Sequence, residues 1–346
     1  MSKVYVGLEL GASDCWVAIA DEGGKIKTHR KLKTTETDLI SLAQGLEDEA
    51  LVLMEECDIA PWARKVLLPH VGEVVVADPR RNLWIYRDSR KDDKIDSRKL
   101  AEIARLGTYF PVWHAYDRSM EELHLAVKVY EKLRGDVTRQ KNRLKAKLRR
   151  QGILWQGDRA YGVRGRQEVL SLVESPVVRD ILEADYEILD FLCARQADAR
   201  ARFMRLGRDI TPVGALQEIP GVGPYVAAVF CAYVKDPRRF GHRSELTRFS
   251  RLGVTHCVSA GKTLKREHLD PAGHGALKDI SRKAFQAAMN SGGDNRFKRT
   301  YAEALARGGS HDHARLTVQR KILATMLAMW RDGSVYDDNH VAQRRA

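Results

Sequence analysis

The sequence is short of cysteine, and its cysteines are not arranged for a metal site or a disulfide framework. The five stand singly, and none forms a Cys-x-x-Cys pair: Cys15, Cys57, Cys193, Cys231 and Cys257. A zinc ribbon and a disulfide-stapled fold are therefore not expected. The sequence also lacks any run of about 18 uncharged apolar residues, so we predict no transmembrane helix. Its first residues lead straight into a strand-like segment without a signal-peptide pattern, and we expect a soluble intracellular protein.

Acidic residues are in the minority. The 346 residues include 59 Lys and Arg against 46 Asp and Glu, a formal net charge of +13. With 44% hydrophobic residues the chain can bury a large core, which excludes wholesale disorder, and its length suggests two or three domains. A basic surplus of this size points to a polyanionic partner, and nucleic acid is the first candidate.

The first 107 residues alternate between strand and helix patterns. Period-two runs separated by turns predict three antiparallel strands, and further apolar runs then alternate with helical periodicity. The predicted strands are 3–10, 15–20, 26–32, 50–54 and 73–77, and the predicted helices are 34–45, 59–68 and 95–106. This order is compatible with a ribonuclease-H-like sheet and with other α/β folds.

The middle of the chain predicts two long helices. Apolar residues recur every three or four positions from Leu123 to Leu148, interrupted at Gln140, and again from Val178 to Leu206. The stretch 151–175 breaks the pattern with glycines, so we expect an antiparallel hairpin, or an arm that dimerises. From Thr211 the chain is mostly helical, and the segment after Asp332 is expected to be loose.

The charge surplus is concentrated on the first of these helices. Residues 128–150 contain ten Lys or Arg but only two acidic residues. A helix with charge of one sign suits a nucleic-acid backbone, DNA or RNA, although a basic but idle face remains an alternative. The binding candidates are Lys128, Lys132, Arg139, Lys141, Arg143, Lys145, Lys147, Arg149 and Arg150.

A second nucleic-acid candidate is the segment Ile219-Pro220-Gly221-Val222-Gly223-Pro224, which precedes an alanine-rich helix. It is typical of a helix-hairpin-helix motif, in which Gly221 and Gly223 let the backbone approach a phosphate. A plain tight turn between packed helices is the alternative.

Four acidic residues stand at the ends of predicted elements. Glu9 and Glu55 end strands, while Asp93 and Asp96 share a face of the helix that follows. Carboxylates from several elements can hold hard divalent ions for phosphodiester chemistry, whereas any one of them alone is more simply a cap or a surface charge. A lone serine in a loop normally carries no function, but Ser259 lies among the cations Lys262, Lys265 and Arg266.

Short stretches along the chain match, in order, the motifs of one known family. In the first hundred residues they are Tyr5-Val6-Gly7-Leu8-Glu9-Leu10, Met54-Glu55, Asp78-Pro79-Arg80-Arg81 and Lys91-Asp92-Asp93-Lys94-Ile95-Asp96-Ser97. The second half adds Ile219–Gly223, Phe240, Leu252-Gly253, Ser259-Ala260-Gly261-Lys262, Arg320-Lys321-Ile322-Leu323, and Met329-Trp330-Arg331-Asp332-Gly333 with Tyr336. From about residue 4 to 337 the chain resembles the DEDD-type insertion-sequence transposases of the "IS one-ten" family, relatives of a pilin-gene DNA invertase.

The resemblance implies a fold of class α/β plus α. It implies an RNase H-like (RuvC-type) domain at 1–115, a helical, coiled-coil arm at 116–210, a mostly α C-terminal transposase domain at 211–337 and a flexible tail at 338–346. The implied activity is a recombinase that cuts and rejoins DNA. Its acidic tetrad falls on Glu9, Glu55, Asp93 and Asp96, and its nucleophilic serine, which forms a phosphoserine link, falls on Ser259.

The resemblance also implies a cofactor, partners and a location. The tetrad would hold Mg²⁺, with Mn²⁺ as an alternative. The partners would be double-stranded DNA at donor and target sites, a structured non-coding guide RNA, and further copies of the chain as a homodimer that assembles into a tetramer. The expected location is the cytoplasm of a prokaryote, at the nucleoid.

The chain departs from the family pattern at some of these positions. Glu9 stands where the family has Asp, and Glu56 follows Glu55 as an alternative ligand. Two other interpretations therefore stay open: a RuvC-like structure-selective nuclease that uses only the acids and water, and a catalytically weakened nucleic-acid-binding copy.

Overall fold

The computed structural model describes residues 3–46, 49–79, 92–112, 117–155, 157–255, 258–259, 262–263 and 268–338, with only the backbone of 258–259 and 262–263. The chain divides into two compact units, residues 1–114 and 115–346, which are described separately. None of the described helices is long and apolar enough to cross a membrane.

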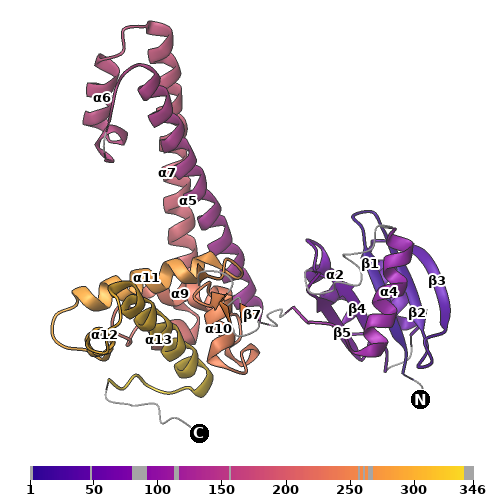
Figure 1. Cartoon of the computed structure of the whole chain (residues 1–346). Helices are drawn as coiled ribbons and strands as arrows, with labels where there is room; N and C mark the ends of the chain where they lie inside the picture. The colour runs from indigo at the N-terminus through magenta and orange to yellow at the C-terminus, as the bar shows by residue number, and fades with distance from the viewer. Residues whose placement is uncertain are drawn as a thin grey trace. The chain divides into compact units, whose positions relative to one another are not determined.

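The N-terminal unit is built on a five-stranded sheet in the order β3-β2-β1-β4-β5 (Figure 1). The strands β1, β2 and β3 are antiparallel neighbours, whereas β4 and β5 run parallel to β1. Their bounds are β1 Tyr5–Leu10, β2 Asp14–Ala20, β3 Ile26–Lys33, β4 Leu51–Glu55 and β5 Glu73–Ala77. The parallel pairs are joined through helices, as parallel strands require.

Helices cover both faces of this sheet. Because side chains alternate along a strand, Val6, Val52 and Val74 pack with α1 (Glu36–Gln44) and α2 (Ala60–Leu67). Tyr5 and Leu53 point to the other face and pack with α4 (Asp93–Leu106). The predicted strands and helices of this unit are confirmed, with ends that differ by at most two residues.

Gly7 sets the distance between α4 and β1. A Cβ at this position would lie 2.0 Å from the Ser97 carbonyl oxygen and 2.3 Å from the Ala101 nitrogen. Any other residue would push the helix off the strand, so the absence of a side chain lets α4 lie directly on the centre of the sheet.

The C-terminal unit begins with a long arm of two helices, α5 (Arg118–Arg150) and α7 (Pro176–Arg208), which lie side by side (Figure 1). They are antiparallel, because Tyr130 packs on Phe203 with ring centroids 5.2 Å apart while the later Gln140 bonds the earlier Asp185. The far end is closed by η1 (Arg159–Tyr161) and α6 (Val163–Ser171). The antiparallel hairpin is confirmed.

Gln140 explains the interruption of the apolar stripe on α5. It is buried, and its amide Nε2 donates to the Asp185 backbone oxygen at 3.0 Å and to Asp185 Oδ1 at 3.1 Å. The other carboxylate oxygen of Asp185 accepts from Lys147 Nζ. A buried polar residue with all its partners fixes the register of two helices rather than weakening them.

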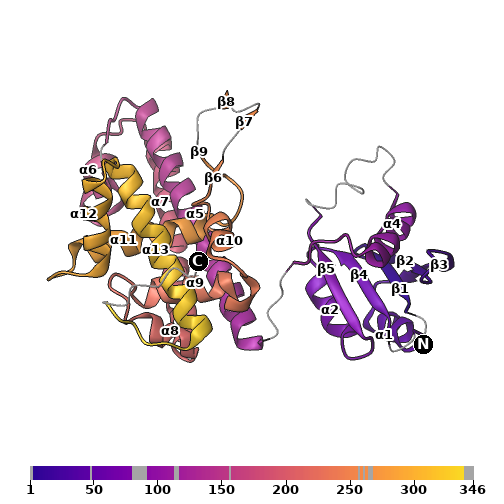
Figure 2. The same cartoon turned by 60° about the horizontal axis from the view of Figure 1, so that its bottom comes forward.

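The rest of the unit is a bundle of helices around the apolar α9 (Pro224–Val234), in which every residue from Val226 to Val234 is buried. Its other helices are α8 (Thr211–Leu216), η2 (Pro237–Arg239), α10 (Arg243–Phe249), α11 (Gly275–Asn290), α12 (Arg296–Ala306) and α13 (His311–Asp332). Between α10 and α11 lie four two-residue strands, β6 Val254–Thr255, β7 Val258–Ser259, β8 Lys262–Thr263 and β9 His268–Leu269 (Figure 2).

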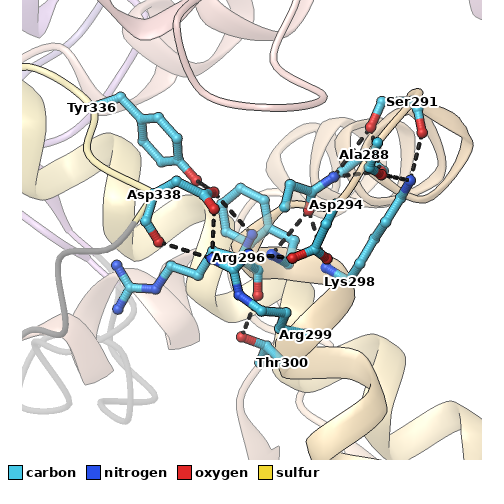
Figure 3. A network of polar contacts seen from close by, with 12 residues as sticks. Ala288, Ser291, Asp294, Arg296, Lys298, Arg299, Thr300, Tyr336 and Asp338 are labelled. Atoms are coloured by element: carbon cyan, nitrogen blue, oxygen red, sulfur yellow. Dashed lines mark hydrogen bonds and ion pairs between the residues drawn. The ribbon is translucent and has the colours of Figure 1, made fainter.

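The segment after α13 is not loose up to residue 338, contrary to the expectation from its polarity. Asp338 accepts a bond from the Arg296 backbone nitrogen at 2.9 Å and another from the Tyr336 hydroxyl at 2.8 Å (Figure 3). It also forms an ion pair with Arg299. Asp338 thus holds the first turn of α12, where free N–H groups attract a carboxylate. Residues 339–346 lie outside the described part.

Candidate active site

Glu9 and Glu55 come from neighbouring parallel strands. Leu8 of β1 pairs with Met54 of β4, so the register continues with Glu9 beside Glu55 at the carboxyl ends of both strands. Both are half-buried, and the alternation of the strands turns them toward the face that carries α4. Glu56, the alternative ligand, is exposed just beyond the strand, where its backbone nitrogen donates to Ala77.

The first turn of α4 lies at the same end of the same face. Lys94, in the first turn of α4, places its Nζ 5.6 Å from the centroid of the Trp16 ring. Trp16 of β2 is in turn paired with Glu9 of β1. Later residues of α4 pack with Tyr5 and Leu51 at the other end of those strands. The helix therefore runs antiparallel to β1 and brings its N-terminus to the strand ends that carry Glu9 and Glu55.

Asp93 and Asp96 belong to this turn, but their surroundings differ. Asp93 is exposed, whereas Asp96 is buried and its Oδ1 lies 3.3 Å from Lys99 Nζ. Asp92 caps the helix by accepting from the Lys94 backbone nitrogen, and this is why α4 begins at Asp93 rather than at the predicted residue 95. The helix dipole favours all three carboxylates at this end.

A histidine on the edge strand β3 supports the same turn. Arg98 Nε donates to His29 Nδ1 at 3.0 Å, so the ring proton sits on Nε2, which is 3.2 Å from Ser97 Oγ. Ser97 Oγ in turn donates to the Lys94 backbone oxygen at 3.0 Å. Burial and the neighbouring Arg98 lower the pKa of His29, which keeps the ring neutral as this network requires.

The four predicted acids thus share one end of one sheet face. Among the described residues, however, no group of three or more His, Cys, Asp or Glu side chains is placed closely enough to hold a metal ion. Another acid of this sheet, Asp14, is engaged by Lys31 and Lys33, and the hydrogen bonds from Lys33 and Lys31 lower its pKa.

Ser259 lies at the end of a ladder of very short strands. It pairs with Lys262 across β7 and β8, which form a two-stranded antiparallel hairpin. The side chains of both residues, and the whole of Lys265 and Arg266, lie outside the described part. The strands β6 and β9, which flank this hairpin in the sequence, form a second two-stranded antiparallel sheet, with Val254 opposite Leu269 and Thr255 opposite His268.

The base of this ladder is pinned to the bundle. The Asp270 nitrogen donates to the Gly253 oxygen at 2.8 Å, and the His274 nitrogen donates to the Phe249 oxygen at 2.7 Å. Arg320 of α13 donates from two nitrogens to the Leu252 oxygen, at 2.9 and 2.6 Å. Burial lowers the pKa of this guanidinium, and its bonds to a neutral carbonyl show that its role here is to hold the base.

The basic helix α5 presents five exposed cations along one line, which we call the α5 stripe: Lys128, Lys132, Arg139, Arg143 and Arg150. At 100° per residue they fall within about 60° of one another, and at 1.5 Å per residue they span about 33 Å. Arg139 of the stripe pairs with Asp136, and the other predicted cations lie off this line. Lys141 pairs with Asp158 at 3.0 Å and Lys147 with Asp185, while Lys145 is half-buried and Arg149 is exposed off the line.

The two glycines of the turn before α9 differ in whether the fold requires a glycine. Gly221 has φ +85°, and a Cβ there would lie 2.3 Å from the Ala284 oxygen of α11, so packing of the turn already requires glycine. Gly223 precedes α9 in extended conformation, with open space where a Cβ would be. A phosphate contact at either residue stays a prediction.

Comparison with known families decides what this chain is. Residues 6–152 match a family model described as a transposase, DEDD_Tnp_IS110, and residues 213–302 match the Transposase IS116/IS110/IS902 family. The chain belongs to the IS110 family of transposases. It is a DNA transposase, an enzyme whose substrate is DNA. Among curated proteins, none matches it significantly.

The support residues of this transposase were not predicted from sequence. His29 and Arg320 lie far along the chain from α4 and from the base of the serine hairpin that they support. His29 stands in no recognisable motif, and Arg320 begins the family stretch Arg320-Lys321-Ile322-Leu323, from which no role for it followed. The predicted acids were recognisable because each ends a strand or begins a helix, and chemistry at such ends is common.

Proposed function

We propose that this transposase is an RNA-guided DNA recombinase that cuts and rejoins DNA through a phosphoserine intermediate, with an acidic tetrad that binds Mg²⁺. The proposed acidic tetrad is supported mainly by one observation: Glu9, Glu55 and the first turn of α4 lie at the same end of the same sheet face. The mixed sheet, antiparallel through β1 and then parallel, fits an RNase H-like, RuvC-type domain.

The donor set fits a hard divalent cation, because Glu9, Glu55, Asp93 and Asp96 offer carboxylate oxygens. These four residues would hold Mg²⁺, or Mn²⁺, which when bound stabilises charge on the attacking and leaving oxygens of a phosphodiester. The protein's own contribution is to orient the acids: Asp92 caps α4, and His29 with Ser97 fixes its first turn. The longer Glu9 takes the position of an aspartate.

Ser259 would supply the nucleophile. Its hydroxyl oxygen forms a bond to a DNA phosphorus while one bridging P–O bond breaks; the serine proton is released and the departing DNA oxygen gains one. Attack by a DNA hydroxyl on the phosphoserine then reverses these changes and reseals a strand without any external energy source. The hairpin would present the serine, because its base is pinned while its strands are only two residues long.

The α5 stripe would bind the guide RNA or the DNA backbone. Five exposed cations on one line can follow one phosphate strand, and because phosphate contacts carry no sequence information, base pairing by the RNA would select the sites. Since a reaction on donor and target needs several active centres, we propose a homodimer that assembles into a tetramer.

The test is a reaction of the full chain with DNA that carries the element ends, with transcripts of the flanking sequence and Mg²⁺. We expect a protein–DNA adduct that survives denaturant, lost in Ser259→Ala and Asp93→Ala and in the presence of a chelator. Ser244→Ala, in an exposed serine at the start of α10, serves as the matched control and keeps the adduct.

Two results would contradict the proposal. Strand breaks without an adduct, unchanged in Ser259→Ala, would indicate a RuvC-like nuclease that uses water. Salt-sensitive binding with neither breaks nor adduct, on every element end supplied, would indicate a nucleic-acid-binding copy that has lost its chemistry.

A further inference from the structure

Three aromatic and histidine rings meet where α9 ends. Tyr233 of α9 lies between His124 of α5, with ring centroids 5.4 Å apart, and His274 at the start of α11, 5.1 Å away. His274 also packs on Phe249 of α10, at 4.5 Å. The site is thus assembled from four helices, and His124 is fixed further by its Nδ1, 2.9 Å from the Ala232 oxygen.

Four cations surround these rings. The guanidinium of Arg239 stacks on Phe249, 4.5 Å from its centroid, and Arg251 Nε donates to the Gly273 oxygen at 2.8 Å, beside His274. Lys128 and Lys235 complete the group, which we call the Tyr233 patch: His124, Lys128, Lys235, Arg239, Arg251 and His274. The charges that act most strongly on His274 all come from these four cations.

Two acids near the Tyr233 patch are engaged in other contacts. The Tyr233 hydroxyl donates to Glu131, and Asp236 pairs with Arg238 at 2.8 Å. Burial together with the neighbouring cations lowers the pKa of His274 and of His124 to about 4, so both rings are neutral at pH 7. The patch therefore combines a positive potential with two neutral rings.

Two of the cations stand on strained backbone. Lys235 and Arg251 are the positive-φ residues other than glycine in the described part of the chain, with φ of +62° and +55°. Lys235 has ψ −50°, and the Asp236 nitrogen bonds the Val234 oxygen at 2.7 Å, which makes it the centre of a γ-turn of the rare, strained form. Glycine would adopt a positive φ at lower cost, so the presence of a cation at each of these positions motivates a functional hypothesis.

The Tyr233 patch also lies at the foot of the hairpin that carries Ser259. Arg251 stands three residues before β6, and His274 follows β9 and is bonded through its nitrogen to Phe249. The patch therefore stands where the chain enters and leaves the hairpin segment.

We propose that the Tyr233 patch binds a phosphodiester group of the nucleic-acid strand that enters the serine hairpin. The inference rests on the proposed function, in which Ser259 acts on DNA. The cations would neutralise the phosphate, while the stacked rings keep Arg239 and His274 in place. Because DNA and RNA share this group, both sources are tested.

The experiment measures the affinity of the full-length protein for labelled DNA and RNA duplexes of the same sequence over a series of salt concentrations. The variant is the double substitution Lys235→Asn with Arg251→Asn. We expect the affinity of the double variant to fall at least tenfold. The slope of the logarithm of the association constant against the logarithm of the salt concentration should become shallower by about one for each phosphate that the variant no longer neutralises. The melting temperature should change little, because the loss of the Arg251 bond to Gly273 is offset by an asparagine at a positive φ.

A matched control removes the same kind of charge elsewhere. Arg307→Asn acts on an exposed cation paired with Glu303 at the end of α12, on the other side of the bundle from α10 (Figures 1 and 2), and should leave affinity within twofold. As a second variant, His274→Asn keeps a residue that can cap α11, whose present cap makes no side-chain bond, and should also weaken binding.

The outcomes separate this inference from the proposed function. Loss of DNA affinity alone, or of RNA affinity alone, supports the patch and identifies its ligand. Unchanged affinity and salt slope for both duplexes in a folded double variant would overturn it. A lower melting temperature with unchanged affinity would show a purely structural role and overturn it as well. The covalent adduct is not used here, so a protein that makes no adduct can still bind through this patch.

Discussion

The carboxylates of the N-terminal unit and the serine of the C-terminal unit differ in how extensively the surrounding secondary structure holds them. Glu9 and Glu55 end strands in the middle of a five-stranded sheet, and the helix with Asp93 and Asp96 lies directly on that sheet. Ser259 stands in a strand of two residues, held through a short ladder and a pinned base. Orientation of the acids is built into the core, whereas the hairpin depends on a few bonds at its base.

This difference suits the two kinds of chemistry. A set of carboxylates for Mg²⁺ requires near-ideal geometry, so rigid elements carry it. A nucleophile that first becomes linked to one DNA end and then gives it to another must follow its substrate, and elements with few contacts open most easily. The predictions below test each side of the comparison, beginning with the largest effect.

The strongest test of the rigid side is Gly7→Val. Its side chain would collide with the Ser97 carbonyl and the Ala101 nitrogen, so α4 must leave the sheet. We expect the N-terminal unit to lose more than about 3 kcal/mol of stability, measured by thermal unfolding, and the adduct to disappear. Gly23→Ala, where the nearest atom is a flexible Asp21 oxygen at 3.4 Å, should be nearly neutral. Equal melting temperatures for the two variants would contradict the close packing.

On the hairpin side, Arg320→Leu removes both bonds to the Leu252 oxygen. That carbonyl then has no charged donor, so we expect about 1–3 kcal/mol of destabilisation in chemical unfolding and a larger loss of adduct yield. Arg315→Leu, which removes an exposed cation paired with Asp312 one turn earlier in α13, is the control. If Arg320→Leu formed adduct at the normal rate, the base would not position the serine.

His29→Leu tests the support of the α4 turn. The substitution removes the bonds to Ser97 and Arg98 but leaves the sheet in place, so we expect less than about 1 kcal/mol of stability change. The reaction should need several-fold more Mg²⁺ to reach half its maximal rate. Because an amide can replace both bonds of the neutral ring, His29→Gln should restore part of the metal response. A rate loss without any change in the metal requirement would contradict this positioning role.

The most gradual expected effect is a pH dependence of the C-terminal unit, because it is spread over about three pH units. The pKa of His124 and of His274 is about 4 in the folded chain, against an ordinary 6.5. Between these values the unfolded chain binds more protons, so stability falls as the pH falls from about 7 to 4. The melting temperature should decline over that window, and less steeply in His274→Asn. An identical decline in both proteins would show that His274 does not titrate as the structure indicates.

Most of the N-terminal unit was predictable from the sequence because its elements have strong periods and clear ends. The bounds of the first three strands followed from alternation and those of the next two from short apolar runs, and the four acids stood out because each lies at the end of an element. The first turn of α4 was missed by two residues since its cap, Asp92, stands among several acids in the sequence, and only the bond to the Lys94 nitrogen distinguishes it.

Other features depend on tertiary contacts that no local sequence pattern indicates. Strands β6 to β9 are too short to show a period, and Gly221 owes its place to α11, whose Ala284 lies far along the chain. The polar composition after Asp332 predicted a loose tail, but Asp338 accepts a hydrogen bond from the Arg296 backbone nitrogen at the start of α12. Lys235 and Arg251 carry no sequence signal, because backbone strain is visible only in the folded chain.

The most direct measurement is to locate the nucleotide in the protein–DNA adduct by digesting it with nuclease and protease and sequencing the labelled peptide by mass spectrometry. We expect a single nucleotide phosphate on Ser259, in the peptide that contains β7 and β8. A phosphate on any other residue, or strand breakage with no labelled peptide, would contradict the assignment of metal binding to a rigid acidic centre and of nucleophilic attack to the serine hairpin.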